Sequence, residues 1–484
     1  MNEQRFYIST AIPYVNAKPH IGFALELIQT DAKLRYERLK RGDTNTFGLT
    51  GSDENSLKNV RAAEEAGEEI ASFVERHAEE MRALGPLLDL SFNDFIRTRE
   101  ERHIKGAQKL WSACKPEDIY KKSYTGLYCV GCEQFYTEKE VPDGICPDHK
   151  KPLEKIEEEN YFFKLSNYQE QLEELISSDT LRIIPESRKN EVLSFIRGGL
   201  EDFSVSRSQE RARHWGVNVP LDDSQVMYVW FDALSNYITA LGYADDEEMY
   251  KKFWVENENR SHVIGKGILR FHAVYWPAML LSAGIPLPTE LFVHGYITAE
   301  GEKMSKSIGN VIHPKALVDE YGVDAVRYYF LREIPSHGDG DYSHARMEER
   351  YAELANQLGN LVSRVAAMSE SYFGGVLSDV DRDWSKEEAV LEAHMKEYDF
   401  KAYLDAVFEV VHEANEIVDK KAPFKLVKED EVAAKQVLSE IADQIRFIGR
   451  ALKPIIPQTA TAILERYGKI IQKGEALFPR RDNV

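Results

Sequence analysis

Residues 6–23 of the chain read Phe-Tyr-Ile-Ser-Thr-Ala-Ile-Pro-Tyr-Val-Asn-Ala-Lys-Pro-His-Ile-Gly-Phe. The first five residues form a run typical of a β-strand, and Pro13-Tyr14 marks a turn after it. A helical pattern begins near His20, keeps apolar side chains on one face and stops at Gly42. A second strand is predicted at 44–50. A strand, a helix and a strand in this order predict a parallel sheet.

Length and composition restrict the class of protein. The chain has 484 residues, which at roughly 150 residues per domain suggests about three domains. Hydrophobic residues at 43% and aromatic residues at 11% exclude a disordered or fibrous protein. No apolar run approaches the ~20 residues that span a bilayer, and residues 1–10 lack a secretory signal. Four cysteines fit a reducing compartment, so we expect a cytoplasmic protein without a membrane partner.

The net charge of −20 disfavours a general polyanion binder, because a surface that coats DNA or RNA should be basic. It does not exclude nucleic acid, since one specific partner can dock on a local basic strip. Charge alone therefore leaves the partner open.

The patterning predicts an α/β sheet domain split by an insertion and followed by a helical bundle. Beyond the insertion we expect strands at 227–231, 262–264 and 291–298, and a helix at 271–281. Two apolar stripes at helical spacing predict the bundle: Leu354, Leu358, Leu361 and Val365, then Tyr403, Val407, Val410, Ala414 and Ile417. The predicted first sheet half, insertion, second sheet half, connecting region and bundle cover 1–114, 115–215, 216–290, 291–345 and 346–484.

Pro19-His20-Ile21-Gly22-Phe23 lies where a strand passes into a helix. Ligands of open parallel sheets bind at such positions, and the free N–H groups of a helix start favour phosphate. Gly22 would let a nucleotide approach the backbone, and His20 can donate a hydrogen bond to a phosphate oxygen. The alternative is an ordinary first turn of a helix.

Lys303-Met304-Ser305-Lys306-Ser307 stands between Gly301 and Gly309. Two lysines three residues apart, with hydroxyls between them and glycines around them, suit a mobile loop that closes on a polyphosphate. The alternative is a solvated basic loop.

A third pattern predicts metal binding. Cys129 and Cys132 are separated from Cys146 and His149 by thirteen residues, and each pair encloses two residues. This is the spacing of a tetrahedral structural zinc site. The alternative is a set of buried thiols without metal, and Cys114 lies outside the pattern as a packing residue.

The two lysine and histidine segments resemble the signatures His-Ile-Gly-His and Lys-Met-Ser-Lys-Ser of class I aminoacyl-tRNA synthetases. The second signature is matched completely and the first at three of four positions. Within that class, further segments resemble the methionyl-tRNA synthetase family over nearly the whole chain: Ser9–Asn16, Tyr228–Ala233, Phe271-His272, Trp276–Met279 and Val293–Tyr296.

The resemblance implies that the chain activates L-methionine with ATP and transfers it to the terminal adenosine of tRNA(Met). Magnesium would accompany ATP, and the zinc site would be structural. It implies catalytic roles for His20, Lys303 and Lys306. It implies that ATP is bound by His20, Gly22, Arg207, Lys266, Lys303 and Lys306.

The resemblance also implies two binding surfaces. Asp53 would bind the substrate ammonium, with Tyr14 close by. The methionine side chain would be enclosed by Ile12, Trp230, Tyr237, Ile268 and His272, and an aromatic wall suits a thioether. In the bundle, anticodon bases would be read by Asn360, Arg364, Pro423 and Phe424, although a solvated helix face would give the same pattern.

Three positions depart from the family pattern. Phe23 replaces the last histidine of the first signature, Gly267 replaces an aspartate, and Phe424 replaces the usual tryptophan. These changes keep three rivals open: a synthetase for another amino acid, a catalytically silent tRNA-binding paralogue, and a zinc-dependent nucleic-acid module. An insertion of about 100 residues is short for the editing domain of the isoleucine, valine and leucine enzymes. We expect a monomer, because no residues follow the predicted bundle.

Overall fold

The computed structural model describes residues 5–129, 134–136, 141–147, 150–245, 247–304, 309–380 and 382–479. The chain forms two compact units. The sheet unit contains the described residues of Met1–Pro19, Glu37–Pro86 and Ser91–His294. The helical unit contains those of His20–Tyr36, Leu87–Leu90 and Gly295–Val484.

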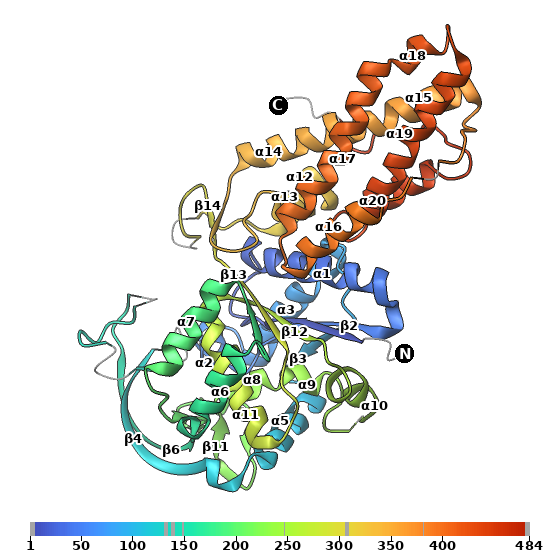
Figure 1. The fold of residues 1–484 in the computed structure, drawn as a ribbon. Helices are drawn as coiled ribbons and strands as arrows, with labels where there is room; N and C mark the ends of the chain where they lie inside the picture. Colours follow the sequence, from blue (N-terminus) through green and yellow to red (C-terminus); the bar gives the residue numbers. More distant parts are fainter. Residues whose placement is uncertain are drawn as a thin grey trace. The chain divides into compact units, whose positions relative to one another are not determined.

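A six-stranded parallel sheet forms the centre of the sheet unit (Figure 1). Its strands, in spatial order, are β3 (Asp94–Arg97), β2 (Thr46–Ser52), β1 (Phe6–Thr10), β12 (Arg260–Gly265), β13 (Glu290–His294) and β7 (Arg182–Ile184). The order reverses between β1 and β12, and the carboxyl ends of strands at such a reversal form a crevice suited to ligands. The predicted parallel sheet and the helical C-terminal region are confirmed.

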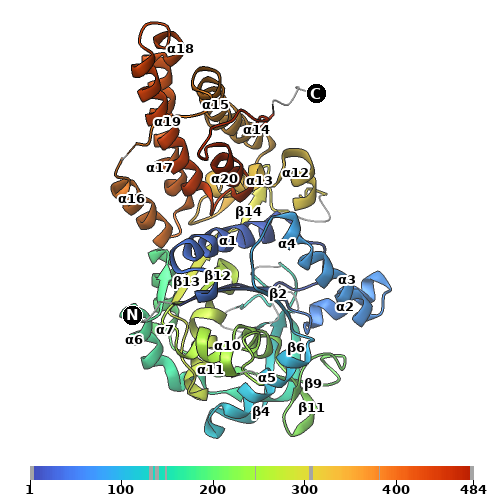
Figure 2. The same ribbon diagram turned by 90° about the vertical axis from the view of Figure 1, so that its right-hand side faces the viewer.

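Every side chain of β1 is buried, as expected for a central parallel strand. Figure 2 shows α5, α10 and α11 together beside the sheet strands. Within this layer Gly106 of α5 allows a close approach to α9, because a Cβ at Gly106 would lie 2.3 Å from Cγ2 of Thr239. The helices of this unit are α2 (Leu57–Ala66), α3 (Ile70–Arg82), α4 (Leu84–Leu87), α5 (Glu101–Ala113), α6 (Gln169–Ser177), α7 (Glu186–Arg197), α8 (Val229–Leu234), α9 (Asn236–Thr239), α10 (Glu247–Tyr250) and α11 (Trp276–Ala283).

The predicted insertion carries two smaller sheets. The first has the order β5 (Gln134–Tyr136), β4 (Ile119–Cys129), β6 (Glu154–Phe163) and β8 (Phe203–Ser204), and β4 and β6 form its long curved antiparallel pair (Figure 1). The second has the order β10 (Asn218–Val219), β11 (Asp222–Met227) and β9 (Ser206–Ser208). Strand β7 lies within the predicted insertion but pairs with β13, so this segment also completes the edge of the main sheet.

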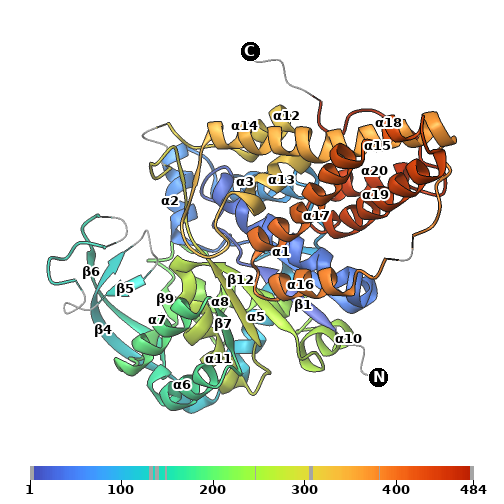
Figure 3. The same cartoon turned by 45° about the horizontal axis from the view of Figure 1, so that its top comes forward.

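The helical unit is organised around a buried ion pair. Arg327 lies 2.7 Å from Asp31, neither side chain is exposed, and the guanidinium also donates to the carbonyl oxygens of Leu88, Pro454 and Ile455. Figure 3 shows α17, α19 and α20 side by side. The helices are α12 (Pro314–Tyr321), α13 (Val323–Arg332), α14 (His344–Glu353), α15 (Asn360–Phe373), α16 (Ser385–Lys396), α17 (Phe400–Lys421), α18 (Pro423–Leu426), α19 (Glu431–Leu452) and α20 (Pro457–Arg466), with a strand pair β14 (Ile297–Ala299) and β15 (Gly340–Tyr342). Helix α1 (Ile21–Arg41) has residues in both units.

Two predicted strands differ in the structure. The expected strand at 227–231 is wrong, because β11 ends at Met227 and α8 begins at Val229. Short apolar runs do not distinguish a strand from a buried helix. The expected strand at 291–298 is two strands, since Gly295 interrupts it: a Cβ there would lie 1.9 Å from the carbonyl oxygen of Gly338. Across the residues described, every helix is too short or too polar to cross a bilayer.

Candidate functional site

The predicted methionine-binding residues follow the carboxyl ends of three neighbouring strands. Ile12 and Tyr14 follow β1, Asp53 follows β2, and Ile268 follows β12. The carboxyl ends of adjacent parallel strands meet at one edge of a sheet, so topology alone brings these residues together. Trp230, Tyr237 and His272 reach the same place from helical segments, through the contacts described next.

Tyr14 and Asp53 are neighbours through their backbones, which form an isolated parallel bridge. The backbone N–H of Asp53 donates to the carbonyl oxygen of Pro13 at 2.9 Å. Asp53 is buried, with 3% of its surface exposed, and its Oδ1 accepts a hydrogen bond from the backbone N–H of Asn55 at 3.3 Å. A buried carboxylate held in this way is a suitable partner for a small cation.

The aromatic wall is continuous from Tyr14 to Tyr237. The rings of Tyr14 and Trp230 lie 6.5 Å apart, those of Trp230 and His272 6.2 Å apart, and those of His272 and Tyr237 5.7 Å apart. Ile12 borders Gly51, where a Cβ would lie 3.1 Å from Ile12 Cγ2. The structure therefore brings all seven predicted methionine-binding residues into one connected group.

His272 is held in one tautomer. Its Nδ1 lies 2.9 Å from the carbonyl oxygen of Ile268, which can only accept, so Nδ1 carries the proton. Nε2 then accepts a hydrogen bond from the hydroxyl of Tyr237 at 2.6 Å. Burial lowers the pKa of His272 to about 4, so the ring is neutral at pH 7.

Sequence reasoning missed two residues of this group as site residues. Phe271 stacks on Trp230, with ring centroids 3.9 Å apart and planes 6° from parallel. His262 on β12 contacts Tyr237, with ring centroids 4.0 Å apart, and its Nδ1 lies 2.7 Å from the hydroxyl of Ser9. Burial holds the pKa of His262 well below its usual range. A histidine in an apolar strand was the available signal for this residue.

The two basic residues predicted to bind ATP in the sheet unit differ in their surroundings. Lys266 lies directly after β12, at the crevice edge. Arg207 lies on β9 of a smaller sheet, is buried, and donates to the hydroxyl of Ser204 and the carbonyl oxygen of Ser206. Its guanidinium also lies 4.2 Å from the ring centroid of Tyr228.

The His20 segment belongs to the helical unit. The backbone N–H of Gly22 donates to Nδ1 of His20 at 3.0 Å, which leaves the ring proton on Nε2. Burial, with a smaller contribution from His313, lowers the pKa of His20 to about 4. The ring of Phe23 stacks on His20 at 4.4 Å. His20 is therefore a neutral donor through Nε2, beside the residue that departs from the family signature.

Only part of the predicted lysine loop can be described. Lys303 is exposed, and its carbonyl oxygen accepts from Nδ2 of Asn310 at 3.2 Å. Lys306 lies outside the described residues. Its role, and its relation to His20, stay predictions.

Two of the four predicted zinc ligands are described. Cys129 and Cys146 are buried in one small cluster with Tyr136 and Val141. The chain turns tightly at Cys146, whose backbone N–H donates to Lys151 and whose carbonyl oxygen accepts from Lys150. Cys132 and His149 lie outside the described residues. Cys114 is buried elsewhere, with its thiol 3.9 Å from the carbonyl oxygen of Met279, as predicted for a packing residue.

The predicted anticodon residues gather on two helices of the helical unit. Asn360 is exposed at the start of α15, and Arg364 one turn later forms an ion pair of 3.3 Å with Asp419 of α17. Four residues after Asp419, Pro423 is buried, and Phe424 is 40% exposed. An exposed ring beside polar side chains is suited to stacking on a base.

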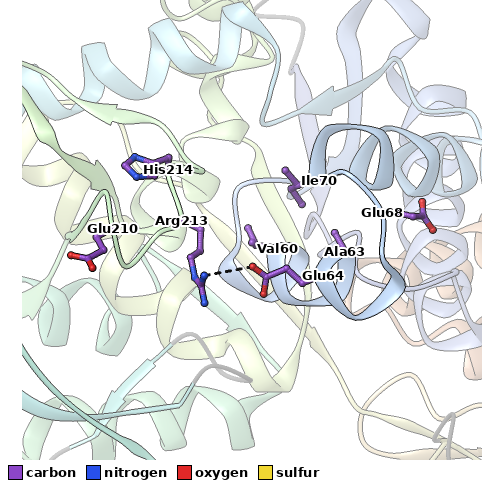
Figure 4. A pocket seen from close by; sticks show the side chains of 8 residues that line it. All are labelled: Val60, Ala63, Glu64, Glu68, Ile70, Glu210, Arg213 and His214. Carbon is purple, nitrogen blue, oxygen red and sulfur yellow. Dashed lines mark ion pairs between the residues drawn. The ribbon is translucent and has the colours of Figure 1, made fainter.

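One pocket of about 490 Å³ lies between α2 and the segment 210–214, away from the seven grouped residues (Figure 4). Arg213 and Glu64 face each other across it at 3.7 Å. Trp215, which follows this segment, donates from Nε1 to the carbonyl oxygen of Glu54 at 2.7 Å. The pocket thus borders the segment that carries Asp53, but none of the predicted substrate residues lines it.

Comparison with known proteins assigns this arrangement. The model of the family tRNA synthetases class I (M) matches residues 6–366. A methionine–tRNA ligase of Clostridium acetobutylicum is 40% identical over 514 aligned positions, covering 99% of this chain and 79% of that protein. One from Brucella suis is 43% identical over 481 positions, covering 96% of this chain and 92% of that protein.

The fold is also shared with solved structures. The methionyl-tRNA synthetase of Mycobacterium tuberculosis in complex with methionyl-adenylate superposes with a TM-score of 0.92 at 36% identity, covering 99% of this chain and all of that one. Its apo form gives a TM-score of 0.84 at 33% identity and covers 99% of each chain.

Proposed function

This chain belongs to the methionyl-tRNA synthetase family of class I tRNA synthetases, and we propose that it joins L-methionine to tRNA(Met) with ATP. In the first step the methionine carboxylate attacks the α-phosphate of ATP, which gives methionyl-adenylate and releases pyrophosphate. In the second, a ribose hydroxyl of the terminal adenosine attacks the carbonyl carbon, and AMP leaves. The observation that carries the proposal is the single group formed by the seven predicted methionine-binding residues.

In this reaction Asp53 is the counter-ion of the substrate ammonium. It is buried and already held by the backbone N–H of Asn55, so little reorganisation is needed when the ligand arrives. The methionine side chain lies against Trp230, Tyr237 and His272, because thioether sulfur makes favourable contacts with aromatic rings. A neutral His272 suits such an uncharged side chain.

Activation needs no general base, since the attacking carboxylate is already ionised at pH 7. The rate then depends on positioning and on stabilising charge that grows on the phosphates. Nε2–H of His20 donates to a phosphate oxygen, and Lys266, Lys303 and Lys306 supply positive charge. Arg207 reaches ATP only after leaving its bonds to Ser204 and Ser206. Magnesium bound to ATP supplies further charge neutralisation.

The insertion holds zinc through Cys129, Cys132, Cys146 and His149. Two buried cysteines in one small apolar cluster, each in a Cys-x2 pair, fit a thiolate-rich structural site. The metal would crosslink the distal part of β4 to the turn at Cys146, and it takes no part in the reaction. In the helical unit, Asn360, Arg364, Pro423 and Phe424 bind the anticodon by stacking and by reading base edges.

The deciding experiment is the exchange of labelled pyrophosphate into ATP by the purified protein. Exchange is expected only when methionine is added. Exchange driven by leucine or isoleucine instead would contradict the pocket assignment. No exchange with any amino acid, together with retained tRNA binding, would identify a catalytically silent paralogue.

A further inference from the structure

A chain of buried polar contacts runs behind the predicted methionine pocket. Nδ2 of Asn55 donates to Oδ2 of Asp232 at 3.1 Å, and Oδ1 of the same carboxylate lies 3.1 Å from Nε2 of His103. Nδ1 of His103 lies 2.9 Å from the hydroxyl of Thr239. Asp232, His103 and Thr239 are completely buried, and Asn55 is 6% exposed.

Three members of this chain stand two residues after a pocket residue. Asn55 follows Asp53 on the turn after β2. Asp232 follows Trp230 on α8, and Thr239 follows Tyr237 on α9. The fourth member, His103 on α5, is the group that ties α8 to α9.

We propose that His103, Asp232 and Asn55 are positioning residues that hold Asp53, Trp230 and Tyr237 in the arrangement that binds methionine. This inference rests on the proposed function. The three residues act through the backbone segments that they share with the pocket.

The contacts restrict how these segments move. Separating a buried histidine from a buried carboxylate leaves an uncompensated polar group, so α5, α8 and α9 shift together or not at all. Asn55 is fixed through two acceptors of its Nδ2, Asp232 and the carbonyl oxygen of Thr98, while its backbone N–H donates to Oδ1 of Asp53. The position of the ammonium-binding carboxylate is thus coupled to the helix that carries Trp230.

Packing on the same helices leaves little freedom for adjustment. The close approach of Gly106 to Thr239 brings α5 directly onto α9. The ring of Trp111, also on α5, lies 5.0 Å from that of Phe231, which stands between Trp230 and Asp232. A change in the polar chain is therefore transmitted to the pocket instead of being absorbed around it.

The test is Asp232→Asn in the full-length protein, measured by methionine-dependent pyrophosphate exchange. We expect the KM for methionine to rise at least tenfold, a typical effect of removing a supporting hydrogen-bond partner, while the KM for ATP changes less than twofold. Discrimination against norleucine, which lacks the sulfur, is expected to fall. A merely structural role would reduce the active fraction, measured by active-site titration, without moving either quantity.

The matched control is Asp118→Asn in the same unit. Asp118 is also buried and accepts from Tyr168, Ser282 and Asn167, but these partners lie outside the pocket group. It is expected to lower the melting temperature and leave the KM for methionine unchanged. Asn55→Ala, which removes the amide and keeps the His103–Asp232 pair, should raise the KM for methionine as Asp232→Asn does.

The inference is overturned if both pocket-side variants raise the KM for methionine no more than Asp118→Asn does. It is overturned as well if Asp232→Asn does not fold and Asn55→Ala keeps a normal KM. Absence of methionine-dependent exchange in the wild-type protein is a different result, because it removes the proposed function and this inference together.

Discussion

The hydroxyl of Tyr237 donates a hydrogen bond of 2.6 Å to Nε2 of His272. Because Nδ1–H of the same ring donates to the carbonyl oxygen of Ile268, the three residues form one directed chain from α9 to the turn after β12. The imidazole is neutral and has no remaining donor or acceptor. The methionine pocket therefore meets this side of the wall as an apolar surface, although it is built from polar side chains.

Tyr237→Phe tests this relationship. The variant leaves Nε2 of His272 buried without a donor, which costs about 1–3 kcal/mol. We expect a lower melting temperature and a several-fold higher KM for methionine in pyrophosphate exchange. Tyr120→Phe is the control, because it removes a hydroxyl that donates to Asp202 at 2.8 Å in the insertion. Equal KM values for the two variants would refute a pocket role for the Tyr237 hydroxyl.

The neutral state of His272 predicts a dependence of stability on pH. Its pKa is about 4 in the folded protein, below the 6.5 of an exposed histidine. Between these values the unfolded chain binds more protons, so stability is complete above pH 6.5 and declines as pH falls toward 4. This one group accounts for about 1 kcal/mol between pH 7 and pH 5.5.

The measurement is the free energy of unfolding in urea at both pH values. In His272→Gln, whose amide can still accept from Tyr237, the loss between pH 7 and pH 5.5 should be smaller by that amount. An identical loss in wild type and variant would show that His272 does not stay neutral over this range.

Local patterns predicted the parts of the site that follow strand ends. Ile12, Tyr14 and Asp53 could be placed because the order of strands and turns alone brings them to one sheet edge. The stacking of Phe271 on Trp230 and the bond between His103 and Asp232 join residues 41 and 129 positions apart, and no spacing rule encodes such contacts. Their partners are chosen by packing, which only the folded structure displays.

Gly22→Ala tests the His20 segment. A Cβ at Gly22 would lie 2.7 Å from Cε1 and 2.9 Å from Nδ1 of His20, so the ring must turn away and lose its bond to the backbone. We expect a KM for ATP raised several-fold with little change in the KM for methionine. Gly85→Ala is the control, because its Cβ meets open space. If the two variants give the same KM for ATP, the His20 ring does not need this orientation.

Lys306→Ala tests whether the lysine loop acts on the transition state. Charge on the phosphates grows during the attack, so a cation directed at it raises the rate more than it strengthens binding. We expect adenylate formation to slow by about 10²–10³-fold, the range for one lost electrostatic donor, with methionine binding nearly unchanged. Lys315→Ala, which removes an exposed lysine paired with Asp319, serves as the control. Equal losses in rate and binding would place the effect of Lys306 in the ground state.

Cys129→Ser tests the zinc proposal. A serine hydroxyl does not replace a thiolate as a zinc ligand, so the purified variant is expected to lose the metal, measured by atomic emission spectroscopy. Cys114→Ser is the matched control: burial raises the pKa of the Cys114 thiol to about 12, and an un-ionised thiol cannot serve as a ligand. Its metal content should equal that of the wild type. Since the site is structural, Cys129→Ser should retain methionine-dependent exchange while becoming more sensitive to proteolysis within 115–215. Unchanged zinc in Cys129→Ser would show that the paired cysteines are packing residues like Cys114.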